Sequence, residues 1–411
     1  MAVLRLIFRD AFARDFGVAL WDGTRIRAAS GERFVLRVNS SAALRVALTP
    51  PLDLAAGRAF GAGLLEVDGD LESAVDALFV ARNAMGPFDL FRLVRLLRRL
   101  PKATPPPLRE AKLRGRMHSR SRDRAAIGFH YDQPIAFYRS FLDREMIYSC
   151  AYWDEGIETL DAAQSAKIEY TLRKLRLTPG ERLLDIGCGW GALVVHAARQ
   201  GAQALGITLS RLQYEEAGRR IAEAGLTDRA RVELRDYREL RGEEFDKIVS
   251  IGMFEHVGRA RFGDYFRAAY AALRAGGLFL NHAIADQSGG RGERGGGFLG
   301  RFIFPDGEVV DVPASLKAAE AAGFEVRDVE NLREHYTKTV RAWLANLDRN
   351  CNDAIAAAGE RSYQLWRLYL AGSAQGFNTG RIGVHQSLLA KPDSAGHVTL
   401  PPTRRDLYVS L

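Results

Sequence analysis

Cysteine is scarce in this chain of 411 residues, and the three that occur, Cys150, Cys188 and Cys351, lie far apart. An odd and dispersed set of cysteines predicts neither a disulfide framework nor a zinc site. No apolar run approaches the roughly 18 residues that a helix needs to cross a bilayer. Arg5 and Arg9 interrupt the apolar N-terminus, where a secretion signal would be continuous. We therefore expect a reduced, cytoplasmic protein without a metal site.

Acidic residues are also in deficit. Asp and Glu total 50 against 58 Lys and Arg, which gives a formal charge of +8. Hydrophobic residues make up 47% and charged residues 26%, proportions that exclude a disordered chain, a collagen-like fibre and a coiled coil. The length indicates two or three domains, since a domain typically spans about 150 residues. The positive excess favours polyanionic partners such as nucleic acid or anionic lipid.

The positive charge is concentrated between Arg92 and Arg124, which hold twelve Lys or Arg and only two acids, Glu110 and Asp123. The same stretch contains Pro101 and three consecutive prolines at 105–107, so it cannot form one continuous helix. We interpret residues 86–125 as a basic linker. It could dock on anionic phospholipid headgroups or simply be solvated, and the sequence leaves both open.

The segment before this linker, residues 1–85, predicts a small α+β domain. Short β-rich runs at 18–21, 34–38, 44–48 and 64–67 are separated by turn residues, and a helical pattern follows from 71 to about 83. No catalytic constellation lies in this segment.

Residues 126–411 show a different pattern, in which strands alternate with helices. We expect strands at 182–186, 204–208, 232–234, 247–251 and 278–280, with helices at 192–200 and 210–224. This alternation predicts an α/β fold with a doubly wound, Rossmann-like parallel sheet. Such sheets bind ligands beyond the carboxyl ends of their strands.

The strongest local motif is Asp185-Ile186-Gly187-Cys188-Gly189-Trp190-Gly191, which follows a strand and opens a helix. Alternate glycines let the backbone turn tightly and approach a cofactor, although dinucleotide enzymes share such turns. Asp185 before the first glycine and the Gly-x-Gly-x-Gly spacing favour S-adenosylmethionine, because a carboxylate there can engage a cationic ligand. Cys188 lies between two glycines with no base nearby in the sequence, so it is not expected to be a nucleophile.

Four motifs together carry a specific resemblance: Tyr148 to Trp153, Leu184 to Gly191, Thr208 to Gln213, and Met253 to Gly258. With them the chain resembles the cyclopropane fatty acid synthase family, S-adenosylmethionine-dependent enzymes related to the mycolic acid cyclopropane synthases. The resemblance runs from about His130 to Asp406. It implies a class I methyltransferase domain that transfers the methyl carbon of S-adenosylmethionine to the cis double bond of an unsaturated phospholipid acyl chain. A carbocation would then lose a proton to a bound bicarbonate and close a cyclopropane ring.

The resemblance also assigns the cofactor site. Asp236 and Tyr237 fall where the adenine is expected. The remaining expected contacts of S-adenosylmethionine, Asp185 included, are Tyr148, Ser149, Gly187, Cys188, Gly189, Thr208, Leu209, Ser210 and Gln213.

For the chemistry, the resemblance implies a bicarbonate cradle made by the backbone near Cys150, the side chains of Glu255, His282 and Tyr336, and the backbone of Ile284. A carboxylate beside bicarbonate is repulsive unless the two share a proton, so one of them should titrate unusually. Without the resemblance, Glu255 reads as a surface carboxylate at a helix start, and His282 and Tyr336 as ordinary core residues.

An apolar tunnel for the acyl chain is expected near Phe298, Phe302, Ile303 and Phe304, with the glycine-rich stretch 289–297 as a mobile flap or an ordinary surface loop. Ser373 stands where the family commonly has cysteine, which leaves identity with the best-known synthases open.

Other functions remain possible from the sequence. The same cation could lose a neighbouring proton and give a methyl- or methylene-branched chain, which would need a reductase partner. An inactive lipid-binding module is a further alternative, whereas a nucleic-acid methyltransferase lacks a base-flipping signature here. We expect a homodimer, associated peripherally with the inner face of the membrane and its unsaturated phospholipids, with a role for residues 1–125 in membrane contact or dimer assembly.

Overall fold

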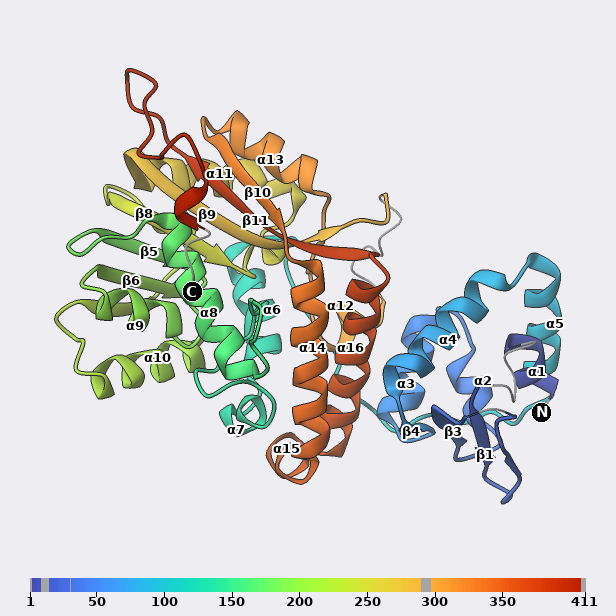
Figure 1. Cartoon of the computed structure of the whole chain (residues 1–411). Helices are drawn as coiled ribbons and strands as arrows, with labels where there is room; N and C mark the ends of the chain where they lie inside the picture. Colours follow the sequence, from blue (N-terminus) through green and yellow to red (C-terminus); the bar gives the residue numbers. More distant parts are fainter. Residues whose placement is uncertain (1, 9–14, 30, 290–296, 408–411) are drawn as a thin grey trace.

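The computed structural model describes residues 2–8, 15–29, 31–289 and 297–407. A smaller N-terminal part and a larger sheet-based part lie on either side of two long helices, α14 (Arg333–Arg349) and α16 (Glu360–Asn378) (Figure 1). Gln375 on α16 donates to Asp76 at 2.9 Å, and Arg341 on α14 pairs with Glu72 at 2.7 Å. Polar contacts therefore join the N-terminal part to these two helices.

The N-terminal part combines a four-stranded sheet with helices around one apolar core. Its sheet has the order β2-β1-β3-β4, in which β1 and β3 are parallel and the other pairs are antiparallel. The elements are α1 (Ala2–Phe8), β1 (Gly17–Leu20), β2 (Arg25–Ile26), β3 (Phe34–Val38), α2 (Ala43–Ala47), α3 (Leu52–Gly61), β4 (Leu65–Gly69), α4 (Leu71–Ala84) and α5 (Pro87–Leu97).

One predicted strand in this part is wrong. Residues 44–48 form the end of helix α2 and its C-cap, not a strand. Ala43, Leu44 and Ala47 are its buried residues, a helical spacing. Val46 is the one β-branched residue of this segment, so its preference for a strand is weak. Burial of one helix face and the helix formers Ala, Leu and Arg favour the helix instead.

The larger part is built on a seven-stranded sheet with the order β10-β11-β9-β8-β5-β6-β7. The predicted strands and their helical crossovers are present, and the doubly wound α/β architecture is confirmed. The bounds are β5 (Arg182–Ile186), β6 (Gln203–Thr208), β7 (Ala230–Leu234), β8 (Phe245–Ile251), β9 (Leu273–Asp286), β10 (Glu325–Asn331) and β11 (Ile382–Ala390).

The expectation of a purely parallel sheet needs one correction, because β11 is antiparallel to both neighbours, β9 and β10. After β10 the chain runs out along α14 and back along α16 (Figure 1). It thus re-enters the sheet from the end at which it left, and the strand that follows must run in the opposite direction.

Helices cover both faces of this sheet. Helices α8, α9 and α10 share one apolar cluster with it, and α11 and α13 share another.

Residues 101–114, which contain the prolines, form neither helix nor strand, and α6 begins at Arg120. The other elements are α6 (Arg120–Tyr131), α7 (Ile135–Arg139), α8 (Leu160–Leu175), α9 (Ala192–Arg199), α10 (Arg211–Glu223), η2 (Tyr237–Glu239), η3 (Phe254–His256), η4 (Arg259–Arg261), α11 (Phe262–Ala272), α12 (Phe298–Phe302), α13 (Val312–Ala321), α15 (Cys351–Ala358) and η5 (Arg405–Leu407).

None of the described helices is both long enough and apolar enough to cross a membrane.

Candidate functional site

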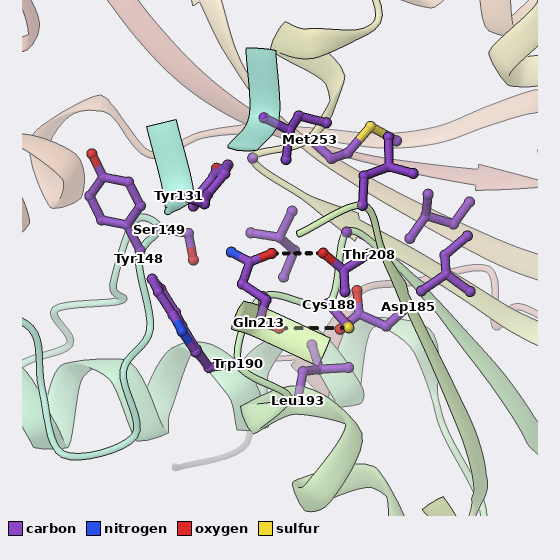
Figure 2. A pocket seen from close by; sticks show the side chains of 18 of the residues that line it. Tyr131, Tyr148, Ser149, Asp185, Cys188, Trp190, Leu193, Thr208, Gln213 and Met253 are labelled. Atoms are coloured by element: carbon purple, nitrogen blue, oxygen red, sulfur yellow. Dashed lines mark hydrogen bonds between the residues drawn. The ribbon is translucent and has the colours of Figure 1, made fainter. Parts of the chain in front are cut away.

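A large pocket opens at the carboxyl ends of β5, β6 and β8 (Figure 2). Its empty space is about 1120 Å³, including the part that is open to solvent. Most residues expected to contact the cofactor line it: Tyr148, Ser149, Asp185, Gly187, Cys188, Gly189, Thr208, Leu209, Gln213 and Tyr237.

Two expected cofactor contacts, Ser210 and Asp236, are absent from this lining. The hydroxyl of Ser210 caps α10 by accepting from the backbone N–H of Gln213 at 3.3 Å. Asp236 is buried beside Arg238, whose Nη2 donates to it at 2.6 Å. Burial acts to raise the pKa of Asp236, but the hydrogen bonds from Arg238 outweigh burial, so that the pKa is lowered from its ordinary value. Both side chains support neighbours that line the pocket.

The glycine-rich turn has the conformation that its sequence predicts. Gly187 has a φ of 85°, and a Cβ there would lie 2.8 Å from the Cβ of Met253. Gly191 has a φ of 84°, and a Cβ there would lie 2.9 Å from the Cβ of Ala217 on α10. Larger residues would therefore strain the backbone and obstruct the packing that shapes this end of the pocket.

Asp185, the last residue but one of the buried strand β5, lines the pocket (Figure 2). Burial raises the pKa of Asp185 to about 7, while the positive charge of Lys167 acts in the opposite direction. Burial lowers the pKa of Lys167 to about 8, and its Nζ donates to the Ser149 hydroxyl at 3.2 Å. The site thus holds a carboxyl group that an arriving cation can keep ionised.

Lys167 lines this pocket, and the sequence interpretation missed it. The available signal was its position on α8 among buried residues such as Ala163, Ala166 and Tyr170, because a lysine on a buried helix face needs a partner.

Thr208 and Gln213 both line the pocket and are joined by a hydrogen bond (Figure 2). The Thr208 hydroxyl donates to the amide oxygen of Gln213 at 2.7 Å and accepts from the backbone N–H of Ser210 at 3.2 Å. This network fixes the orientation of the Gln213 amide, because its oxygen is already engaged.

The five residues expected to act in the chemistry do not line this pocket. Cys150, Glu255 and His282 are buried, and Ile284 and Tyr336 are partly buried. Glu255 accepts the backbone N–H of Ile284 through Oε1 at 2.6 Å, whereas its Oε2 is buried with no hydrogen-bond partner among the described residues. Burial raises the pKa of Glu255 to about 7, and the Ile284 amide partly offsets this. The Ile284 amide therefore holds Glu255.

His282 lies within β9, opposite Ile251 at the end of β8. Its Nδ1 is 3.2 Å from Nε2 of Gln386, and its Nε2 is buried without a partner among the residues that the structure describes. Burial, together with the charges of Lys167 and Lys174, lowers the pKa of His282 well below its usual range. The imidazole is therefore neutral near pH 7.

Tyr336 and Cys150 come from distant parts of the chain to the same region as Glu255. Beyond the effect of burial, the charges of Tyr369, Cys150 and Glu255 raise the pKa of Tyr336. Cys150 is fully buried, which raises the pKa of its thiol, and its Sγ lies 3.3 Å from the carbonyl oxygen of Ala151. Thus Cys150 is a protonated thiol and Tyr336 a neutral phenol.

Aromatic side chains connect the two sets of residues. Tyr131, Tyr148 and Trp190 line the pocket (Figure 2), and the Tyr148 hydroxyl donates to the Tyr369 hydroxyl at 3.0 Å. Ser373, which replaces the common family cysteine, also hydrogen-bonds to Tyr369. The sequence interpretation did not identify Tyr131, Trp190 or Tyr369 as parts of the site, because aromatic residues are equally common in ordinary cores.

The predicted tunnel residues join this aromatic region. Phe302 and Ile303 are buried in the same apolar cluster as Trp190, and Phe304 stacks on His256 with ring centroids 4.8 Å apart. The N–H of Phe298 donates to Asp53 of α3 at 2.8 Å, so the N-terminal part contacts this region directly. Residues 290–296 of the predicted flap lie outside the described residues.

Comparison with known proteins gives consistent results. The family model described as mycolic acid cyclopropane synthetase matches residues 118–387. A probable fatty acid methyltransferase of Pseudomonas putida is 40% identical over 401 residues, covering 95% of each chain. Cyclopropane mycolic acid synthase 1 of Mycobacterium tuberculosis is 38% identical over 274 residues, which cover 64% of this chain and 95% of the relative.

Solved structures resemble the larger part. The crystal structure of mycolic acid cyclopropane synthase CmaA1 complexed with SAH and CTAB has a TM-score of 0.62 at 38% identity, covering 65% of this chain and 98% of that one. The cyclopropane synthase MmaA2 from Mycobacterium tuberculosis has the same TM-score at 35% identity and the same coverage.

Proposed function

The chain belongs to the mycolic acid cyclopropane synthetase family and is an S-adenosylmethionine-dependent methyltransferase; from this premise we propose that it methylates the cis double bond of an unsaturated phospholipid acyl chain and closes a cyclopropane ring. The observation that carries the proposal is that two buried side-chain atoms, Glu255 Oε2 and His282 Nε2, have no hydrogen-bond partner among the described residues. Glu255 accepts the N–H of Ile284, which packs against an aromatic, apolar cluster.

The reaction explains why such a site is needed. An alkene is a weak nucleophile, and its attack on the methyl carbon of S-adenosylmethionine forms a C–C bond, breaks the S–CH₃ bond and leaves a carbocation. Water would trap that cation, so the reacting carbons must be kept dry. Faces of Tyr131, Tyr148 and Trp190 provide an apolar wall with negative π potential toward a cation.

Loss of a proton from the cation completes the ring, and the site has groups suited to an anionic base. Bicarbonate, when bound, would supply that base. Glu255 Oε2 and His282 Nε2 are buried polar atoms without partners among the described residues, so they fit such an ion. Because the pKa of Glu255 is raised to about 7, its carboxyl can stay protonated and donate to a neighbouring anion instead of repelling it.

A branched product is a second candidate. The relatives that match most of this chain, from Pseudomonas putida and Mycobacterium tuberculosis, are named probable fatty acid methyltransferases and cover 95% and 86% of it. The same cation could lose a proton from a neighbouring carbon and leave a methyl- or methylene-branched chain, which a separate reductase would saturate.

A product assay separates these outcomes. Liposomes of cis-unsaturated phospholipid are incubated with methyl-labelled S-adenosylmethionine, and the lipids are analysed by mass spectrometry and proton NMR. We expect a gain of one CH₂, loss of olefinic signals and new high-field ring protons. Retained olefinic protons with the same mass gain would establish the branched product. No mass gain despite cofactor binding would contradict the proposed substrate.

We also infer that the enzyme reaches its substrate by docking α5 on an anionic bilayer. Phe88 and Phe91 on this helix are 71% and 67% exposed. Arg92, Arg95, Arg98 and Arg99 are exposed on the same helix and its end, while Leu93 and Leu97 face the core. Exposed apolar rings followed by arginines on the same helix are typical of interfacial helices. A symmetric pairing of two α5 helices would instead bring these arginines together and is disfavoured.

The double variant Phe88→Ser/Phe91→Ser should bind vesicles of anionic, cis-unsaturated phospholipid at least about tenfold more weakly, because two exposed rings no longer enter the interface. Flotation of vesicles with bound protein measures this. The variant Trp21→Ser, which removes another exposed aromatic ring elsewhere on the N-terminal part, serves as the control. Unchanged binding, or dissociation of a dimer by the double variant, would contradict the inference.

A further inference from the structure

A buried lysine at the end of α8 contacts polar side chains of β10 and β11. Lys174, in the last turn of α8, is only 1% exposed. Its Nζ donates to Oε1 of Gln386 at 2.9 Å and forms an ion pair with Glu330, and Asp328 lies at 3.9 Å. The two carboxylates offset the free-energy cost of burying the charge of Lys174, and Gln386 accepts a further hydrogen bond from its ammonium group.

Lysine determines which way the Gln386 amide faces. An ammonium group has only donors, so the acceptor that meets it must be the amide oxygen, and the NH₂ group must point elsewhere. Gln386 is itself buried, and β11 places it directly opposite His282 of β9 in the antiparallel pair. Its NH₂ nitrogen lies 3.2 Å from Nδ1 of His282.

The same reasoning fixes the proton of His282. An amide NH₂ donates and cannot accept, so Nδ1 must carry the lone pair in this contact. A neutral imidazole has one ring proton, which must then be on Nε2. Nε2 is the buried atom that has no partner among the described residues. It is a hydrogen-bond donor held ready for an acceptor.

We propose that Lys174 and Gln386 are positioning residues that hold His282 in its Nε2–H tautomer, so that it presents a donor to an anion in the catalytic site. The identity of that anion rests on the proposed function, whereas the tautomer rests on the contacts alone. Of the two neutral tautomers, only this one places a donor at the site, since the other would turn a lone pair toward the anion and repel it.

Nitrogen NMR of the full-length protein with ¹⁵N-labelled histidine tests the proposal, with His282 assigned by the loss of its signals in His282→Gln. In the wild type we expect Nδ1 to be unprotonated and Nε2 protonated. In Gln386→Glu, a carboxylate oxygen replaces the NH₂ group, so Nδ1 should gain a proton. In Lys174→Met the amide is free to turn over, and His282 should populate both tautomers.

Activity gives the second readout. Lys174→Met should lower kcat by about 10- to 100-fold, the range typical of lost second-layer hydrogen bonds, with an unchanged Kd for S-adenosylmethionine. The control is Lys391→Met. Lys391 is a part-buried lysine directly after β11, the strand that carries Gln386, and it donates to the carbonyls of Tyr270 and Leu273, away from His282. Equal melting temperatures of the two variants would exclude general unfolding.

A protonated Nδ1 in the wild type would overturn the proposal, as would an unprotonated Nδ1 in Gln386→Glu. Wild-type kcat in Lys174→Met would also overturn it. Because NMR reads the tautomer without turnover, an enzyme that shows the expected tautomers but does not modify alkenes would refute the proposed function and leave this inference standing.

Discussion

Turnover should fall by at least about 100-fold when Glu255 is replaced by Gln, while S-adenosylmethionine binds normally. Loss of a group that exchanges protons in a reaction typically costs 10²- to 10⁴-fold. Gln has the same shape and can still accept the Ile284 N–H that Glu255 accepts at 2.6 Å. It cannot take up or release a proton, however. Steady-state kinetics on unsaturated liposomes, with calorimetry of cofactor binding, measures the effect.

The matched control is Glu308→Gln. Its backbone N–H donates to the Glu255 carbonyl at 2.9 Å, but its carboxylate accepts from the Arg259 backbone. Kinetics of Glu308→Gln should therefore stay within a few-fold of wild type. Activity of Glu255→Gln close to that of this control would refute a proton-transfer role for Glu255, because the Gln amide can still donate a hydrogen bond to an anion.

Stability against pH gives an independent check on Glu255. Its pKa is about 7 in the folded protein, against an ordinary value of 4.5. The folded protein therefore binds more protons than the unfolded chain between these pH values, and its free energy of unfolding falls as the pH rises through this window. Glu255→Gln removes that cost, which is at most roughly 3–4 kcal/mol because each pH unit corresponds to about 1.4 kcal/mol. The Tm of the variant relative to wild type should be higher at pH 8 than at pH 5.

Replacing Asp185 by Asn should weaken S-adenosylmethionine binding by about 10- to 100-fold. Hydrogen bonds to charged groups contribute about 1.5–3 kcal/mol, and each 1.4 kcal/mol changes Kd tenfold. Asn keeps the shape of the side chain at the end of β5 but not its charge, and it leaves the buried Lys167 without a nearby anion at this position. Isothermal calorimetry with S-adenosylmethionine gives Kd directly.

Asp246→Asn tests whether loss of any carboxylate on the sheet has this effect. Asp246 lies near the amino end of β8, where it accepts the backbone N–H of Arg182 at 2.7 Å. The variant Asp246→Asn should lower the stability of the protein and leave its Kd for S-adenosylmethionine unchanged. An Asp185→Asn enzyme with wild-type Kd would show that the carboxylate does not engage the cofactor.

Local patterns in the sequence were sufficient for the turn that shapes the cofactor pocket. Strand, glycines and helix follow one another within about fifteen residues from Arg182, and the positive φ of Gly187 and Gly191 reflects a requirement that only glycine meets readily. Glu255 follows β8 in the short helix η3, whereas His282 lies within β9, opposite the last residue of β8. In contrast, the short run at 44–48 carried too few residues to distinguish strand from helix.

By itself, therefore, the sequence determined the doubly wound sheet, the pocket edge and the family. The tertiary structure decided which buried polar groups meet: Lys174 lies 212 residues from Gln386, and Gln386 lies 104 residues from His282. It also decided the reversed direction of β11 and the exposure of Phe88 and Phe91. Backbone preferences act over a few residues and can therefore be predicted from the sequence. Pairing between distant side chains depends on strand register and on the cost of burying charge, and those are set only when the whole chain packs.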